Sequence, residues 1–229
     1  MSGVSPKKGL GQHWLNDLAS LESICAAADV REGDQVLDIG PGTGSLTRVL
    51  IDRGAKIFAI EYDTEAVDFL EKDLTSYIPN QLKLEQADIR TFNLMRLEGD
   101  YKIVANIPYY LTSNLIKIIS ESDHPPTIAV LLVQKEVAER VCATAGEMSL
   151  LSVSAQFYWQ TELGLVVPAQ LFTPAPKIDS QVLILKSRQK PLFEVDSKRF
   201  FRLVKAGFAA RRKTLLNSLS GGLRVDKEH

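Results

Sequence analysis

Short apolar runs alternate with amphipathic segments over most of the chain. Apolar runs between turn residues predict buried strands, and apolar positions three or four apart predict helices. Strands that alternate with helices are typical of a parallel sheet covered on both faces. The predicted strands span residues 35–39, 56–60, 82–86, 101–105 and 128–133, and the predicted helices span residues 16–29 (capped by Asn16), 45–53, 64–77 and 113–120.

The pattern changes after Thr161. Residues 162–167 and 181–186 are two β-like runs joined by a proline-rich loop, which predicts an antiparallel hairpin at one edge of the sheet. Lys190-Pro191 marks a linker, and residues 197–220 predict one basic helix that stops at Gly221-Gly222. We therefore expect an α/β fold with a mostly parallel seven-stranded sheet, helices on both faces and an antiparallel edge hairpin.

Composition narrows the class of protein. The chain has 229 residues, a net charge of −1, 45% hydrophobic residues and two cysteines, which exclude a disulfide scaffold or a Cys-rich metal site. No stretch approaches the roughly 18 apolar residues of a membrane span, and the start lacks the apolar run of a signal peptide. We expect a cytoplasmic protein with no membrane contact and no metal.

The near-neutral charge hides an asymmetry between the two ends. Residues 1–185 carry a net −9, and residues 186–229 carry a net +8. A basic element on an acidic body indicates contact with a polyanion. Basic residues that merely solvate a terminal helix remain an open alternative.

A glycine loop follows the first predicted strand. Asp38, Gly40, Gly42 and Gly44 form the pattern D-x-G-x-G-x-G, and glycines let a backbone approach a ligand closely. Glu61 ends the next strand, where a carboxylate can accept both hydroxyls of a ribose.

A third acidic residue favours one kind of cofactor. Asp88-Ile89 follows the third strand, where the carboxylate could accept from an adenine amino group. Three acids suit a positively charged sulfonium nucleoside better than a pyrophosphate, which prefers N–H donors. S-adenosylmethionine is therefore favoured over NAD or ATP. Ordinary turn glycines and solvated acids are the alternative.

The fourth strand ends in Asn106-Ile107-Pro108-Tyr109. The Asn106 side-chain oxygen and the Ile107 carbonyl can both accept from one exocyclic amine, and Pro108 stiffens the turn that holds them. Tyr109 offers a face on which a purine can stack. A proline turn beside a core tyrosine is the competing interpretation.

Five motifs together resemble the ribosomal RNA small-subunit adenine N6,N6-dimethyltransferase family (the KsgA family). The resemblance spans nearly the whole chain, and the last two motifs distinguish this family from other methyltransferases. The motifs are residues 8–15 (KGLGQHWL, similar to K-x-x-G-Q-N-F-L), 38–44, 106–109, 172–180 (FTPAPKIDS) and 211–215 (RRKTL).

The resemblance implies a role for individual residues. Asn106 and the Ile107 carbonyl would hold the target amine in a turn stiffened by Pro108, with Tyr109 on one face of the base and Phe172 on the other. Gln12 would lie in a flexible lid formed by residues 1–16. The residues that would bind S-adenosylmethionine are Gln12, His13, Leu15, Gly40, Gly42, Gly44, Glu61, Asp88, Ile89 and Asn106.

Two departures from the family pattern are visible. His13 stands where asparagine is usual, and the chain ends at His229 where the family continues into a compact helical domain. The resemblance thus implies a methyltransferase domain over residues 1–187, followed at 188–229 by a linker and the start of a truncated RNA-binding domain.

The expected reaction is transfer of methyl groups to N6 of two adjacent adenines in a hairpin loop near the 3′ end of 16S rRNA. The partner would be a pre-30S particle in ribosome biogenesis, and the protein a monomer. Lys205, Arg211, Arg212 and Lys213 are expected on one helix against the rRNA backbone. Alternatively, Arg211 and Arg212 pair with acids of the acidic body.

Other functions stay open at this point. A macrolide-resistance methyltransferase of 23S rRNA shares the glycine loop and N-I-P-Y. A mitochondrial transcription-factor relative and a non-catalytic ribosome-assembly RNA-binding module share the fold. The segments at 172–180 and 211–215 favour the small-subunit enzyme.

Overall fold

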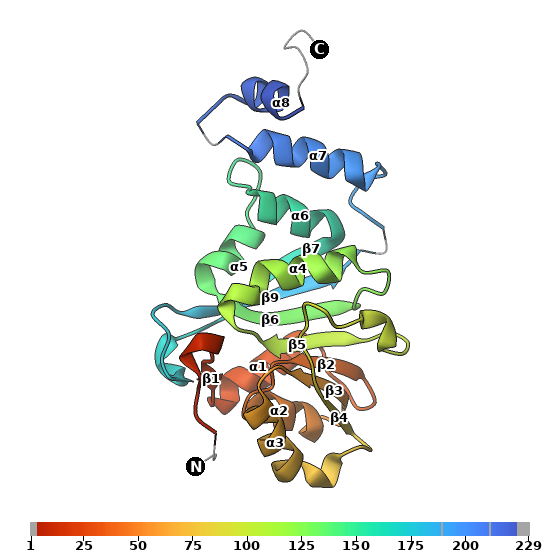
Figure 1. The fold of residues 1–229 in the computed structure, drawn as a ribbon, viewed down its shortest axis with the longest axis vertical. Coiled ribbons are helices and arrows are strands. Elements are labelled where there is room, and N and C mark those ends of the chain that lie inside the picture. Colours follow the sequence, from red (N-terminus) through yellow and green to blue (C-terminus); the bar gives the residue numbers. More distant parts are fainter. Residues whose placement is uncertain (1–3, 189, 211, 224–229) are drawn as a thin grey trace.

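The computed structural model describes residues 4–188, 190–210 and 212–223. A seven-stranded sheet lies in the middle of the molecule, with helices on both faces, and the two C-terminal helices lie at one end (Figure 1). The strands are β1 (Trp14–Leu15), β2 (Gln35–Ile39), β3 (Lys56–Glu61), β4 (Leu82–Gln86), β5 (Lys102–Asn106), β6 (Ile128–Gln134), β7 (Trp159–Val167), β8 (Phe172–Thr173) and β9 (Ser180–Ser187). The helices are α1 (Leu18–Ala27), α2 (Ser45–Asp52), α3 (Thr64–Asp73), α4 (Thr112–Glu121), α5 (Lys135–Val141), α6 (Leu150–Tyr158), α7 (Ser197–Phe208) and α8 (Leu215–Leu223).

The strand order in the main sheet is β4-β3-β2-β5-β6-β9-β7. The first five strands in this order are parallel, whereas β9 pairs antiparallel with both β6 and β7. The predicted parallel sheet with an antiparallel hairpin at one edge is confirmed. Strands β1 and β8 form a separate antiparallel pair that joins the amino-terminal segment to the loop before β9.

Alternate residues of the inner strands enter two different cores. Val36 and Val104 pack with α1 and α2 on one face of the sheet, while Leu37 and Ile103 pack with α4 on the other. This is the two-residue period of a strand buried on both faces. The carboxyl ends of β2, β3, β4 and β5 consequently lie along one edge of a rigid sheet.

The structure corrects two helix boundaries. Asp17, not Asn16, caps α1, because its carboxylate accepts the Ser20 N–H at 2.8 Å while Asn16 accepts from Ser45. Helix α3 ends at Asp73 and is followed by a short 3₁₀ turn, so the predicted helix over 64–77 is too long. Helices α5 and α6 were not predicted.

The predicted single helix over 197–220 is wrong. It is a hairpin of α7 and α8, and Gly222 lies inside α8 instead of terminating a helix. A Cβ at Gly222 would lie 2.7 Å from the Cβ of Ala206, so glycine permits the two helices to approach closely. Lys205 lies on α7, whereas Arg212 and Lys213 lie in the connection between the helices. Arg211 lies outside the described residues.

Aromatic rings fasten α7 to the body of the protein. Phe157 on α6 is 2% exposed and stacks on Phe200, with ring centroids 4.8 Å apart. It also makes edge contacts with Phe193 and Phe201. In the described part of the chain, no ion pair involves Lys205, Arg212 or Lys213. Apolar contacts, not ion pairs, therefore hold the basic helix α7 against the body of the protein.

We predict that Phe157→Ala lowers the free energy of unfolding by roughly 3–5 kcal/mol, the usual cost of truncating a buried phenylalanine. The matched control is Phe208→Ala, because Phe208 is 42% exposed at the end of α7. The control should cost about 1 kcal/mol or less. Urea denaturation measures both, and equal losses would contradict the anchoring role of Phe157.

Candidate active site

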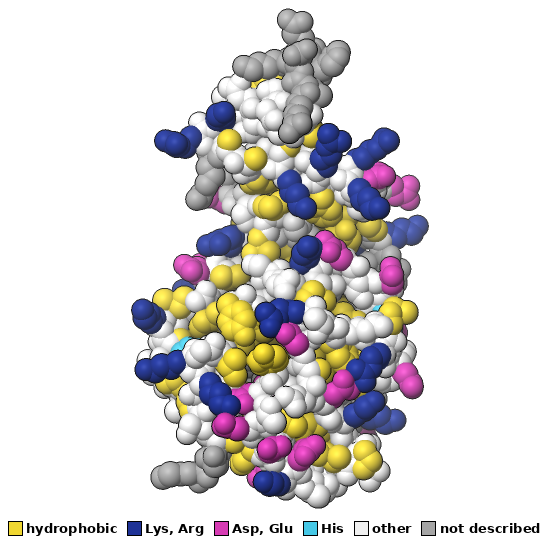
Figure 2. Space-filling view, viewed as in Figure 1, with side chains coloured by type: hydrophobic (Ala, Val, Ile, Leu, Met, Phe, Trp, Pro, Cys, Tyr) yellow, Lys and Arg dark blue, Asp and Glu magenta, His cyan; other side chains and the backbone are white. Residues whose placement is uncertain are grey.

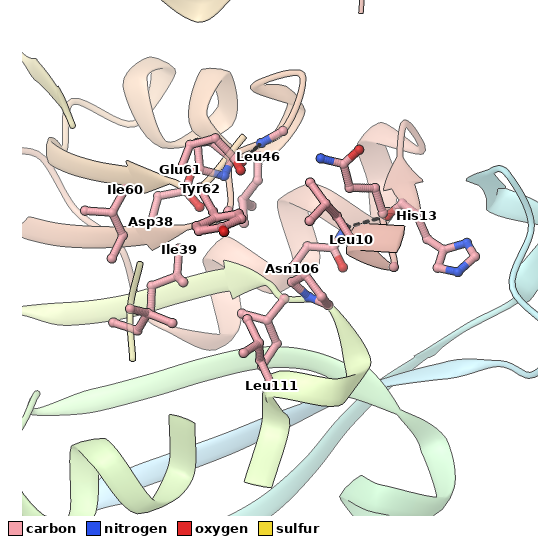
Figure 3. A pocket seen from close by; sticks show the side chains of 18 of the residues that line it. Leu10, His13, Asp38, Ile39, Leu46, Ile60, Glu61, Tyr62, Asn106 and Leu111 are labelled. Carbon is pink, nitrogen blue, oxygen red and sulfur yellow. Dashed lines mark hydrogen bonds between the residues drawn. The ribbon is translucent and has the colours of Figure 1, made fainter. Parts of the chain in front are cut away.

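A pocket opens where β2, β3, β4 and β5 end. The amino-terminal segment covers it from the other side, and the N-I-P-Y turn closes one wall (Figure 3). The lining residues are Leu10, Gly11, Gln12, His13, Trp14, Leu15, Leu21, Asp38, Ile39, Gly40, Pro41, Gly42, Thr43, Ser45, Leu46, Ile60, Glu61, Tyr62, Ala87, Asp88, Ile89, Arg90, Asn106, Ile107, Pro108, Tyr109, Tyr110 and Leu111. Most of the predicted site residues therefore meet in one place.

The glycine loop is shaped by a close approach to Trp14. Gly42 has φ +58°, and a Cβ there would lie 2.8 Å from Trp14 Nε1. That indole nitrogen is buried and has no hydrogen-bond partner among the described residues. Gly44 does not line the pocket: it caps α2 at φ +77°, and a Cβ there would lie 2.7 Å from Leu70. Gly42 thus shapes the cavity, whereas Gly44 shapes the turn into the helix.

Glu61 joins the glycine loop to the end of β3. Its carboxylate is buried and accepts the N–H groups of Gly42 at 3.0 Å and Asp63 at 2.9 Å. Burial raises the pKa of Glu61, and the backbone N–H groups partly oppose that shift. A carboxylate offers about four lone-pair sites, so acceptor capacity remains for a hydroxyl donor such as that of a ribose.

Asp88 carries a partner that the sequence analysis missed. Arg90 donates from Nε to both carboxylate oxygens of Asp88 at 2.9 Å, and from Nη2 to Oδ2 at 2.6 Å. The hydrogen bonds from Arg90 hold the pKa of Asp88 below its ordinary value. Arg90 therefore fixes the direction of a charged acceptor at the pocket.

Asp38 supplies an unfilled acceptor to the pocket lining. The Thr47 hydroxyl donates to Oδ2 at 2.7 Å, while the buried Oδ1 has no partner among the described residues. Burial raises the pKa of Asp38 to about 7. The free acceptors at Asp38 and Glu61 fit a ligand that brings hydroxyl and ammonium donors, as S-adenosylmethionine does.

Asn106 is oriented by the amino-terminal segment. Its Nδ2 donates to the carbonyl of His13 at 3.1 Å, the contact drawn in Figure 3. With the amide nitrogen engaged in this way, Oδ1 remains an acceptor beside the carbonyl of Ile107. The Tyr109 hydroxyl bonds to Ser180 at 2.7 Å, which fixes the tyrosine ring.

Two contacts on opposite sides hold the amino-terminal segment over the pocket. On one side Asp63 accepts from Lys7 Nζ at 2.6 Å and from Gln12 Nε2 at 3.2 Å. On the other, β1 pairs with β8, with Leu15 opposite Phe172. Within the described part of the predicted lid, residues 4–16, the chain is therefore held against the body in this structure.

Not every predicted residue reaches the pocket. Phe172 is 4% exposed and belongs to the same core cluster as its strand partner Leu15, so its role beside the target base remains a prediction. Lys205, Arg212 and Lys213 lie outside the pocket lining. The sequence analysis missed Trp14, Tyr62 and Tyr110 as lining residues, because their contacts form only in the folded chain.

The sheet order and the glycine loop after its first parallel strand define the fold of class I S-adenosylmethionine-dependent methyltransferases. The family described as "Ribosomal RNA adenine dimethylase" matches residues 3–228. The "Ribosomal RNA small subunit methyltransferase A" of Dehalococcoides mccartyi (strain CBDB1) is 40% identical over 228 residues, which cover 98% of this chain and 78% of that relative.

Two solved structures resemble the whole fold. A dimethyladenosine transferase from Plasmodium falciparum superposes with a TM-score of 0.79 at 28% identity, covering 91% of this chain and 75% of that one. The 23S rRNA methyltransferase ErmE superposes with a TM-score of 0.77 at 28% identity, covering 92% and 84%. The chain belongs to the ribosomal RNA adenine dimethylase family.

We predict that Asp38 makes stability fall as pH rises from about 4 to 7. Its pKa is about 7 in the folded chain against an ordinary 3.8, so the folded state binds more protons in that window. Asp38→Asn removes this titration. Relative to the variant, the wild type should lose free energy of unfolding between pH 5 and pH 7.5 in urea titrations without cofactor. A constant difference between the two proteins would contradict the shifted pKa.

Proposed function

We propose that this protein transfers methyl groups from S-adenosylmethionine to N6 of two adjacent adenines in a hairpin loop near the 3′ end of 16S rRNA. The observation that carries the proposal is the side chain of Asn106. Its amide nitrogen is held by the His13 carbonyl, so its oxygen is presented to the pocket that also contains Glu61. Family membership and the small-subunit name of the 40%-identical relative support the choice of substrate.

The residues at the strand ends would hold the cofactor. Glu61 would accept the ribose hydroxyls, and Asp88, fixed by Arg90, would accept from the adenine amino group. Gly40 and Gly42 give the backbone close access, with Ile89, Leu15, Gln12 and the backbone of His13 completing the enclosure. S-adenosylmethionine supplies an electrophilic methyl group at this position.

The N-I-P-Y turn would position the nucleophile. The Asn106 oxygen and the Ile107 carbonyl accept the two N–H groups of adenine N6 and direct its lone pair toward the methyl group. The N6 nitrogen forms the new bond to carbon while the carbon–sulfur bond breaks, and the amine then releases one proton to solvent. Tyr109 stacks on the base, which must be unpaired to enter.

The oligomeric state, the substrate particle and the compartment are proposed from family membership. We propose that the protein acts as a monomer on a pre-30S particle in the cytoplasm during ribosome biogenesis. No helix in the part of the chain that the structure describes is long and apolar enough to cross a membrane. The likeness to ErmE favours one competing substrate, 23S rRNA, as the second candidate.

The basic C-terminal end would meet the rRNA backbone. Figure 2 shows several Lys and Arg side chains around the end of the molecule where α7 lies. Lys205 on α7 and Arg212 and Lys213 beyond it have no ion-pair partners among the described residues, so they remain available for phosphates. Contacts of this kind give affinity without reading bases.

We predict that Glu61→Ala weakens binding of both S-adenosylmethionine and its demethylated product by roughly 10–100-fold, because it removes charged hydrogen bonds to the ribose. The exposed Glu71→Ala on α3 is the matched control and should bind normally. Calorimetry measures both affinities. Unchanged affinity in Glu61→Ala would overturn the ribose assignment.

We predict that Asn106→Ala lowers kcat for methylation of unmodified small-subunit particles by about 100-fold, the scale of losing one positioned polar group. Tyr109→Ala should also lower turnover through lost stacking. Tyr109→Phe keeps the ring and loses only the contact with Ser180, so it should be milder. Full methylation by Tyr109→Ala would refute the stacking role.

We predict that replacing Lys205, Arg212 and Lys213 by alanine flattens the slope of log affinity for rRNA against log salt by about 2–3, at about 0.7–0.9 per phosphate contact. The control replaces Lys56, Lys72 and Lys83, which are exposed on β3, α3 and β4. The melting temperature should stay nearly constant in both proteins. A large loss of thermal stability with an unchanged slope would show that the cations are structural.

A further inference from the structure

The imidazole of His13 lies between the two motifs predicted to enclose the target base. It stacks on Tyr109 with ring centroids 5.8 Å apart and planes 20° apart. Its Nδ1 lies 2.7 Å from the carbonyl oxygen of Pro174, in the F-T-P-A-P-K segment, so this nitrogen is the donor. In Figure 3 the ring points away from Glu61, on the far side of Asn106. The imidazole thus lies against one face of Tyr109 in an offset stack and covers part of that face.

The backbone around His13 is held by contacts that do not involve the imidazole. The His13 carbonyl accepts from Asn106, Gln12 donates to Asp63, and Trp14 pairs with Thr173. The imidazole can therefore rotate about its side-chain bonds while the segment stays in place over the pocket. Displacing this part-exposed ring would break only its contacts with Pro174 and Tyr109 and would leave the backbone contacts of the segment intact.

Tyr109 lacks the same freedom. Its hydroxyl is bonded to Ser180, which is fully buried, and it begins the 3₁₀ turn Tyr109–Leu111 at the end of the rigid N-I-P-Y turn. A purine that stacks on the same face of Tyr109 would therefore displace the imidazole, because the contact with Ser180 and the 3₁₀ turn hold the tyrosine ring in place.

We propose that His13 occupies the base-stacking face of Tyr109 until an unpaired adenine replaces it, and thereby sets how readily the target base enters. The proposal rests on the proposed function, because it takes Tyr109 as the platform for adenine. The imidazole is a small planar ring with an N–H donor, so it keeps Tyr109 covered and the Pro174 carbonyl paired until the larger base arrives. Removing the ring removes a competitor for that face.

Steady-state methylation of unmodified small-subunit particles tests the proposal. His13→Ala and His13→Asn both keep the backbone carbonyl that holds Asn106 and lack the ring. Each should lower the KM for the particle by about three- to tenfold, the scale of one aromatic pair or one neutral hydrogen bond. His13→Phe keeps a ring over Tyr109 and should retain a KM near that of the wild type. A KM that rises or stays unchanged in both His13→Ala and His13→Asn would overturn the proposal and make His13 a brace for Tyr109.

Proton NMR of the His13 ring supplies a readout that does not depend on turnover. Stacking on Tyr109 should shift the imidazole protons upfield, and Tyr109→Leu should abolish that shift. Addition of a hairpin RNA with two unpaired adenines should return the signals toward their ordinary positions in the wild type. Signals that stay shifted while the RNA is bound would contradict displacement.

The two proposals fail in different ways. If Tyr109→Ala methylates small-subunit particles at the full rate, the proposed role of Tyr109 is wrong whatever His13 does. If Tyr109→Ala is impaired while the KM of His13→Ala rises, the role of Tyr109 stands and only the displacement by His13 is refuted.

Discussion

The buried carboxylate of Glu61 is the interaction on which the rest of the site depends. It receives one N–H from the glycine loop at Gly42 and another from Asp63, so a single side chain at the end of β3 fixes two loops. Asp63 in turn holds Lys7 and Gln12 of the amino-terminal segment. That segment presents the His13 carbonyl to Asn106. One buried charge thereby connects the cofactor-facing acids to the residue that would hold the target amine.

The chain of contacts from Glu61 to Asn106 depends on the parallel sheet, because both residues lie at the ends of its strands. Strands β2, β3 and β5 are buried on both faces and β4 pairs with β3 at the edge of the sheet, so the ends of these strands cannot move apart without disturbing a core. A rigid frame suits a reaction in which catalysis is mostly positioning. The covering segment is fastened by polar contacts to Asp63, by the two-residue strand β1 and by the buried side chains of Val4 and Leu15.

The sequence predicted the sheet well because short apolar or alternating runs lie between turn residues at each parallel strand. All five parallel strands were predicted to within a residue or two, and the acids and the N-I-P-Y turn at their ends needed no tertiary information. The break between α7 and α8 was not predictable, because the close packing of Gly222 on Ala206 decides it. Contacts between distant segments, such as His13 with Tyr109 and Lys7 with Asp63, leave no mark in a local pattern.

The proposed function depends above all on the choice of 16S rRNA over 23S rRNA as the substrate. Its most direct test is the transfer of labelled methyl groups from S-adenosylmethionine to two substrates: small-subunit particles that lack dimethyladenosine, and protein-free 23S rRNA. We expect incorporation of up to four methyl groups per small-subunit particle, on two adjacent adenines near the 3′ end of 16S rRNA, and background label on 23S rRNA. Label on 23S rRNA with none on the small-subunit particle would contradict the proposed function.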